Sequence, residues 1–478
     1  MFESLEQLGH TLYLMSVIEK DGTAYALTRT LQGKALVIQG DAAGFTGEAH
    51  GDVTLCPLTA ANAEALRARL PWLRPQPLGL RTSAGCGDRL GLATPGHIRA
   101  VRAVGGDIAP ILAQQSMREN ARTGRSPQQV MDDALWGVFQ EGWREPWGAD
   151  ADHLKTTDDV DVCVAAGYTF FTIDPGAHVD NAAHTDGLET LRGKFTALPW
   201  DALEDSAEAM KARYLGSAQI IEDFTLTFDE TALLRAACKY GRAIAHTVKM
   251  ARHLKAAKSD LPFDLEVSVD ETDTPTSPLE HVFIVSELRR MGVTWVSLAP
   301  RYVGRFEKGV DYIGDLAEFE AEFAKHAAIA RVLGPYKLSL HSGSDKFSVY
   351  PIVAKYTRRL THLKTAGTSY LEALRAIAGV DPALFREILG LAIKRYDEDR
   401  ATYHVSADID NVLMPSLIPD EELADVLDTF DGREALHVTF GSALERFGKR
   451  LLATLEANEE AHYTALERHF IKHLTPFK

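Results

Sequence analysis

Long apolar runs, an excess of basic residues and any export signal are all missing from this chain of 478 residues. No run of 18 apolar residues occurs, so we expect no transmembrane helix. Acidic residues outnumber basic ones by 67 to 51, and the formal net charge of −16 argues against nucleic acids and anionic membranes as partners. The first residues, Met1-Phe-Glu-Ser-Leu-Glu, include neither a basic nor an apolar segment, so no export is expected.

Cysteine is scarce, and the common cofactor motifs are missing too. The four cysteines have no CxxC or zinc-ribbon spacing, which predicts reduced thiols in a cytoplasmic protein; they are Cys56, Cys86, Cys163 and Cys238. Gly85-Cys-Gly-Asp88 lacks the third glycine of a dinucleotide fingerprint, which weakens a nucleotide-binding interpretation. Neither HxH nor HExxH occurs, so local spacing alone does not identify a metal site.

Short strand-like runs alternate with amphipathic helical patterns from residue 77 onward. Eight strands alternating with helices are typical of a (β/α)8 barrel, so we predict an α/β fold of the TIM type. An open doubly wound sheet is the alternative fold. The eight predicted strands are Leu78–Ser83, Ala149–Lys155, Phe170–Asp174, Leu265–Asp270, Thr294–Ala299, Lys337–His341, Thr361–Thr365 and Tyr403–Ala407.

The spacing of these runs predicts three parts. Residues 1–75 form a small N-terminal α+β region, and residues 76–408 form the barrel. An insertion of about residues 175–260 follows the third predicted strand, because this stretch is too long for one crossover; it is expected to be helical at Thr231–Ala256. Residues 409–478 form a C-terminal extension that packs on the barrel and includes a long helix, Ser442–Leu466.

Polar side chains gather where the predicted strands end, which is where barrel enzymes carry their chemistry. The second strand ends in Asp152, His153 and Lys155, and the seventh carries His362 and Lys364. Period two places Glu266, Ser268 and Asp270 on one face of the fourth strand. Arg301 follows the fifth strand, His341 leads from the sixth into a Ser-Gly-Ser loop, and the eighth carries His404.

Imidazoles at several strand ends predict a metal site. A divalent cation needs two to four neutral imidazoles or carboxylates that converge on one point. His153, His341 and His362 are the predicted ligands, with His404 as the alternative third ligand, and zinc, manganese, nickel, cobalt and iron all fit such a set. Strict alternation places Asp152 opposite His153, so both can face the site only at a bulge or a strand end.

At these residues the chain resembles the tagaturonate epimerase family over about residues 75–440. The resemblance implies a metal-dependent isomerase that interconverts D-tagaturonate and D-fructuronate in uronate catabolism, without a nucleotide cofactor. A more distant likeness, to the zinc-dependent class II aldolases, rests on an Asp-His pair and a His-Ser-Gly-Ser run. The motifs that carry the family resemblance are Gly148–Thr156, Thr172–His178, Glu266–Thr272, Leu298–Arg301, Phe306–Asp311, His341–Phe347 and Lys364–Tyr370.

The motif match and the strand geometry together assign the roles. Asp152 and Glu266 are the predicted proton-transfer pair, with Arg81 or Lys337 as a fixed partner if Glu266 is only structural. Lys155, Arg301 and Lys364 are predicted to bind the carboxylate of a small anionic keto sugar acid.

Two other classes of function stay open. One is a class II-like aldolase or another ketose isomerase on a sugar acid, and the other is a sugar-acid-binding protein without catalysis.

Overall fold

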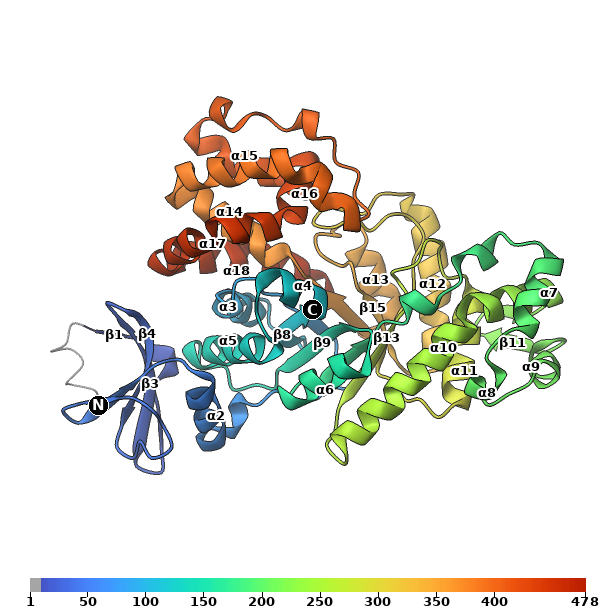
Figure 1. Ribbon diagram of the computed structural model, residues 1–478, viewed down its shortest axis with the longest axis horizontal. Helices are drawn as coiled ribbons and strands as arrows, with labels where there is room; N and C mark the ends of the chain where they lie inside the picture. The colour runs from blue at the N-terminus through green and yellow to red at the C-terminus, as the bar shows by residue number, and fades with distance from the viewer. Residues whose placement is uncertain (1–9) are drawn as a thin grey trace.

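A closed barrel of eight parallel strands forms the centre of the protein (Figure 1). The computed structural model describes residues 10–478. Around the barrel the strands follow the order β10-β13-β14-β15-β16-β7-β8-β9. Their bounds are β7 Ser83–Gly85, β8 Ala109–Ser116, β9 Gly148–Leu154, β10 Phe170–Ile173, β13 Asp264–Ser268, β14 Ser297–Ala299, β15 Lys337–Leu340 and β16 Thr361–Lys364.

The predicted barrel is confirmed, but one predicted strand is wrong and one strand of the barrel was not predicted. The stretch Tyr403–Ala407 is not a strand: its alternate side chains pack instead against α15 (Pro382–Asp399) and α16 (Phe430–Val438), which gives an extended loop the period of a strand. The missing strand is β8, all eight residues of which are buried. Because both faces of β8 are covered, its sequence shows no alternation of apolar and polar residues.

This correction renumbers the barrel. The first predicted strand overlaps β7 only at Ser83, and β8 is the second strand. The large insertion therefore follows the fourth strand, β10, and not the third. Within it, the predicted helix Thr231–Ala256 is confirmed as α10, Glu230–Lys258.

Helices between the strands complete the barrel, and several begin with the sequence signals of an N-terminus. Ser126, Thr156 and Ser277 each accept a hydrogen bond from the backbone N–H three residues on, in reciprocal capping boxes. Lys155 directly precedes Thr156, the N-cap of the helix after β9, so this cap fixes where the loop after β9 ends. The helices are α3 Thr94–Val104, α4 Met117–Thr123, α5 Pro127–Gln140, α6 Thr157–Ala165, α11 Pro278–Arg290, α12 Leu316–Val332, α13 Tyr350–Thr357 and α14 Thr368–Val380.

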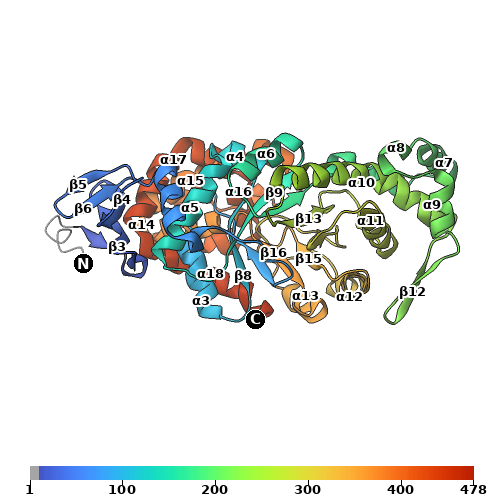
Figure 2. The ribbon, with the colours of Figure 1, turned by 90° about the horizontal axis from the view of Figure 1, so that it is seen from below.

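Additional structure extends from the barrel in three directions. At one end lies an antiparallel sheet with α2 (Ala60–Arg69); its strands are β1 Thr11–Leu12, β2 Ile18–Lys20, β3 Thr23–Thr30, β4 Gly33–Gln39, β5 Glu48–His50 and β6 Val53–Cys56. At the other end the insertion adds α7 Leu188–Thr196, α8 Trp200–Leu203, α9 Ala207–Tyr214 and a hairpin of β11 Ala218–Ile221 and β12 Phe224–Thr227, which projects from the elongated molecule (Figure 2).

The C-terminal helices pack on the barrel. The predicted long helix Ser442–Leu466 is two helices, α17 (Phe440–Ala457) and α18 (Glu459–Leu474), because the chain leaves helical geometry at Asn458. The Asn458 amide donates to the carbonyl of Thr454 and so caps α17. Helix α18 lies against α3 and α14. Within residues 10–478, no helix is both long and apolar enough to cross a membrane.

Candidate active site

A bulge in β9 brings Asp152 and His153 to the same side of the barrel wall. The register of β9 against β10 jumps between Phe171 and Ile173, so that Ile173 pairs with Leu154. His153 adopts a left-handed backbone conformation with φ of 51°, which costs a residue with a Cβ about 1 kcal/mol or more. The bulge that strict alternation required is therefore present, and the backbone strain lies at one of the predicted metal ligands.

Two imidazoles converge at this point, and each is oriented by its own carboxylate. His153 Nδ1 lies 3.1 Å from Asp174 Oδ2, and His341 Nδ1 lies 3.2 Å from Asp270 Oδ1. The two Nε2 atoms then face Asp152 Oδ1, at 4.0 Å from His153 and 3.6 Å from His341. A carboxylate on one ring nitrogen, with the other nitrogen pointing to a shared centre, is the usual support of a metal-binding histidine.

Lys364 neutralises part of a dense group of carboxylates beneath the imidazoles. Its ammonium lies 2.7 Å from Asp152, 2.9 Å from Asp150 and 3.0 Å from Glu266. Burial opposes the charge on Lys364, but the three carboxylates outweigh it and raise the pKa of the ammonium. Burial raises the pKa of Asp150 to about 6, whereas Lys364 and neighbouring imidazoles hold the pKa of Asp152 and of Glu266 below the ordinary carboxyl range.

The charges of this group fit a bound divalent cation. Burial and Lys364 disfavour a proton on His341, yet Asp270 and Glu266 overcome both and raise its pKa to about 10. Glu266 Oε1 lies only 2.7 Å from His341 Nε2. The carboxylates thus carry more negative charge than Lys364 balances, and His341 compensates by keeping a proton. Ligand atoms that share one ion at about 2.0–2.2 Å lie roughly 3–4 Å apart. Asp152 Oδ1 lies 4.0 Å from His153 Nε2 and 3.6 Å from His341 Nε2, and the ligand atoms of the three residues all lie within 4.8 Å of one another.

The third predicted imidazole ligand does not join this group. His362 lies two residues before Lys364 on β16, with Nδ1 2.9 Å from Ser83 Oγ and its ring 5.0 Å from that of Phe170. Burial lowers its pKa to about 3. The alternative, His404, is exposed and lies in the extended segment that is not a strand. The sequence alone does not show which of these two histidines is closer to the site, because both lie in runs that have the alternating pattern of a strand.

The three residues predicted to bind the substrate carboxylate differ in whether the protein already supplies each with a carboxylate partner. Lys364 is buried against carboxylates of the protein, so it is not available to a substrate carboxylate. Lys155 is half exposed and lies 3.2 Å from Asp174 and 3.7 Å from Glu271. The Arg301 guanidinium has no ion-pair partner among residues 10–478, and the residue lines a small cavity together with Asp270 and His341.

Sequence reasoning missed several residues of the site, and for Gln114 the cause is clear. Gln114 donates a 3.0 Å hydrogen bond to Asp152 Oδ2 from β8, the strand that was not predicted. Asp150 lies inside β9 and not at its end, so the strand-end pattern does not predict it, although period two places it on the same face as Asp152. Thr172 likewise lies inside β10; its hydroxyl contacts Lys364 at 2.7 Å and Asp150 at 3.0 Å.

A second buried group of possible metal donors carries its own cation. Asp345 Oδ1 lies 2.5 Å from His469 and 3.0 Å from the Arg433 guanidinium. The Nε2 atom of His473 already accepts a hydrogen bond from the backbone N–H of Asp345. These contacts tie α16 and α18 to the loop that follows β15, and the Arg433 guanidinium already supplies positive charge to Asp345.

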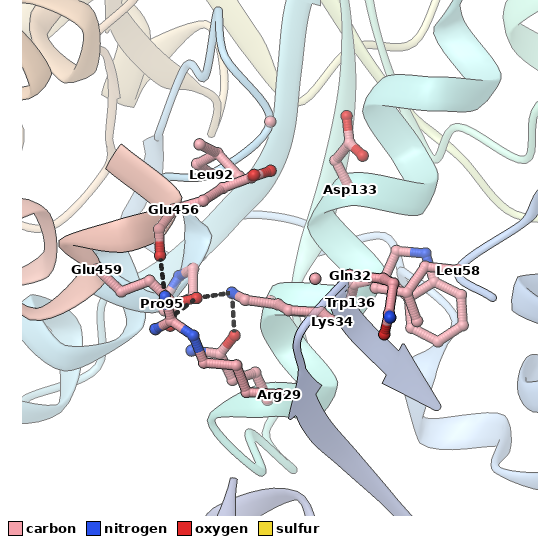
Figure 3. A pocket seen from close by; sticks show the side chains of 14 residues that line it. Arg29, Gln32, Lys34, Leu58, Leu92, Pro95, Asp133, Trp136, Glu456 and Glu459 are labelled. Carbon is pink, nitrogen blue, oxygen red and sulfur yellow. Dashed lines mark hydrogen bonds and ion pairs between the residues drawn. The ribbon is translucent and has the colours of Figure 1, made fainter. Parts of the chain in front are cut away.

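A polar cavity beside the N-terminal sheet lies apart from this group. It has a volume of about 350 Å³ and lies between the β3–β4 strands, α5 and the start of α18 (Figure 3). Lys34 extends into it and bonds Gln140, Tyr463 and Glu459, so its ammonium is engaged within the protein. No residue that lines it belongs to the group around His341.

The barrel and the donors at the carboxyl ends of its strands define the protein class as a barrel enzyme that acts on a small polar molecule. The chain matches the tagaturonate epimerase family over residues 10–477 and belongs to that family. It is 46% identical over 475 residues to the tagaturonate/fructuronate epimerase of Thermotoga maritima, a match that covers 98% of this chain and 96% of the relative. The family resemblance is thus confirmed, over a longer stretch than residues 75–440.

Solved structures of the same family have the same fold. The glycerol-complexed crystal structure of the fructuronate-tagaturonate epimerase from Cohnella laeviribosi aligns with a TM-score of 0.94 at 38% identity, covering 99% of this chain and 98% of that chain. The native crystal structure of that enzyme gives the same values. The chain is therefore an isomerase of the epimerase type.

Proposed function

We propose that this enzyme interconverts D-tagaturonate and D-fructuronate with the help of a divalent cation at the His153–His341 site. The observation that carries the proposal is the pair of imidazoles, each held by a carboxylate on Nδ1, whose Nε2 atoms face Asp152. The substrates are those that the names of the relatives give.

The chemistry of the substrates restricts the route. The two keto-uronates differ at a carbon β to the ketone, so simple enolisation does not acidify the C–H bond at that carbon. Breaking the bond between the α and β carbons, turning the resulting aldehyde and re-forming the bond inverts the centre without any oxidant. Atoms and electrons balance, because the proton lost by the hydroxyl returns to it.

A divalent cation fits the donor atoms of the site. His153 and His341 would hold it through Nε2, and Asp152 replaces the third histidine that the sequence predicted. When bound, such a cation supplies a Lewis acid for the ketone oxygen and for the negative charge that develops there. This assignment moves Asp152 from the predicted proton-transfer pair to the ligand set, because its Oδ1 faces both imidazoles.

Glu266 keeps the predicted role in proton transfer. It is completely buried, and its Oε2 atom has no hydrogen-bond partner among residues 10–478. We assign it the removal of the hydroxyl proton in bond cleavage and the return of that proton after the aldehyde has turned. Lys364 and Thr172 hold the carboxylate in place, at 3.0 and 3.3 Å from Oε1.

The barrel also favours a substrate without phosphate over a sugar phosphate. Many barrel enzymes bind phosphate at the loops after strands 7 and 8, beside a helix N-terminus. Here the ring of His437 from α16 fills that position: a Cβ on Gly367 would lie 2.2 Å from His437 Nε2. This favours a sugar acid over a sugar phosphate, and it does not separate the epimerase from an aldolase or ketose isomerase that acts on a sugar acid.

One experiment separates the three candidate functions. Purified protein is incubated with D-fructuronate, with and without a chelator, and the mixture is followed by chromatography. An epimerase gives D-tagaturonate, and we expect chelation to abolish the conversion and added divalent metal to restore it. Accumulation of three-carbon fragments would instead indicate an aldolase, and unchanged D-fructuronate in the presence of metal would indicate a binding protein.

Arg301 is expected to bind the carboxylate of the substrate. Arg301→Gln should raise KM for D-fructuronate about 10- to 100-fold, because a charge-assisted hydrogen bond contributes roughly 1.5–3 kcal/mol. Binding of D-fructose and D-tagatose, the neutral ketohexose analogues, should change much less. Inhibition constants for these sugars provide the comparison, and equal losses for charged and neutral ligands would mean that Arg301 is structural.

A further inference from the structure

Nearly every cation near the mouth of the barrel already has a carboxylate partner. Arg118 and Lys155 pair with Glu271, Lys364 pairs with three acidic residues, and Arg89 lies 2.7 Å from Glu119. In the described part of the chain, three cations here have no carboxylate within ion-pair distance: Arg301, Lys308 and Lys346. Lys346 is instead bonded to three backbone carbonyls, whereas the ammonium of Lys308 has, among residues 10–478, one hydrogen bond, 2.9 Å to the hydroxyl of Ser342.

Lys308 contacts the loop that begins at the proposed metal ligand His341. Its partner Ser342 directly follows His341 in the chain. The same small cavity is lined by Ser342, His341 and Arg301. Lys308 and Arg301 both lie in the loop after β14, seven residues apart, and reach the loop after β15 from one side.

The backbone around Lys308 is held on both sides by buried cations. Lys346 donates to the carbonyl of Glu307 at 2.7 Å, to that of Val310 at 2.5 Å and to that of Ser344 at 2.8 Å. The Arg433 guanidinium donates to the carbonyl of Gly309 at 2.5 Å. The protein thus fixes the backbone of residues 307–310 yet leaves the half-buried Lys308 side chain with a single neutral partner. Such an ammonium is preorganised for an anion that the protein does not supply.

We infer that Lys308, with Ser342, is a specificity-determining residue that binds the carboxylate of the keto-uronate and sets the preference for sugar acids over neutral ketoses. The inference rests on the proposed function and adds a residue that the sequence did not single out. Ser342 contacts the Lys308 ammonium and lines the same cavity as Arg301, so two cations without a carboxylate partner among residues 10–478 flank one loop of a protein of net charge −16.

The test compares three variants of the full-length protein. Lys308→Met removes the charge and keeps the aliphatic stem, whereas Lys308→Arg keeps the charge. Arg305→Met is the matched control, because Arg305 is an exposed cation of the same loop that pairs with Glu307 at 3.2 Å. We measure kcat and KM for D-fructuronate, the inhibition constant of D-tagatose and the melting temperature of each variant.

Lys308→Met should raise KM for D-fructuronate about 10- to 100-fold, with kcat within about threefold and the D-tagatose constant unchanged. Lys308→Arg should recover most of the loss, and Arg305→Met should behave like the unmodified protein. An unchanged KM in Lys308→Met, or an equal loss in Lys308→Arg, overturns the inference.

A failure of the proposed function would look different. If the unmodified protein does not convert D-fructuronate, the epimerase proposal fails. The role of Lys308 is then decided by calorimetric binding of D-fructuronate to the unmodified protein and to Lys308→Met. Equal affinities would refute the inference, and a loss confined to Lys308→Met would support it.

Discussion

Glu266→Gln should lower kcat by about 10²–10⁴-fold and leave the protein folded with its metal bound. The amide keeps the size of the side chain and can still accept a hydrogen bond from Lys364, but it cannot take up the hydroxyl proton. The structure also corrects the partner expected for this residue. Arg81 pairs with Asp107 at the surface, and Lys337 donates to Ser83, so Lys364 is the cation that contacts Glu266.

Glu280→Gln provides the control for this variant. Glu280 is also buried beside a lysine, with its carboxylate 3.3 Å from the Lys239 ammonium, but it lies in the first turn of α11 and accepts a hydrogen bond from the backbone N–H of Ser277. Its substitution should lower the melting temperature and leave kcat nearly unchanged. If Glu266→Gln gives the same pattern as Glu280→Gln, then Glu266 is a structural carboxylate and the proton-transfer assignment is wrong.

The barrel could be predicted from the sequence because most of its strands are short apolar runs between helices with clear starts. The two errors have the same physical origin. Strand β8 is buried on both faces and shows no period, whereas residues 403–407 show a strand period because one side packs on α15 and α16. Periodicity reports which side chains are covered, and it does not report whether the backbone pairs with another strand.

Part of the site could be predicted from the sequence, because the functional side chains of barrel enzymes lie at the ends of the strands. Asp152, His153, Glu266 and His341 do lie together, as their positions after strands implied. Their pairing was not predictable, because it depends on neighbours from other strands. Lys364 illustrates this: from the sequence it is a free cation, and in the fold three carboxylates surround it.

His341→Ala should lose the bound divalent metal and nearly all turnover while the protein remains folded. His341 supplies one of two convergent Nε2 atoms, and Asp270 on its Nδ1 fixes the orientation of the ring. Removal of one of the three proposed protein ligands should weaken metal binding far more than loss of a supporting residue, which alone costs about 10–100-fold. Metal content is measured on protein purified without added metal, together with the melting temperature and kcat for D-fructuronate.

His362→Ala is the matched control, since it removes a buried imidazole from the same barrel. His362 bonds Ser83 and lies outside the group formed by Asp152, His153 and His341, so its loss should leave the metal content near that of the unmodified protein. Should His341→Ala not fold, His341→Gln keeps most of the side-chain volume and serves the same comparison. Full metal occupancy in a folded His341 variant, or loss of metal in His362→Ala alone, would show that the ion is held elsewhere in the barrel.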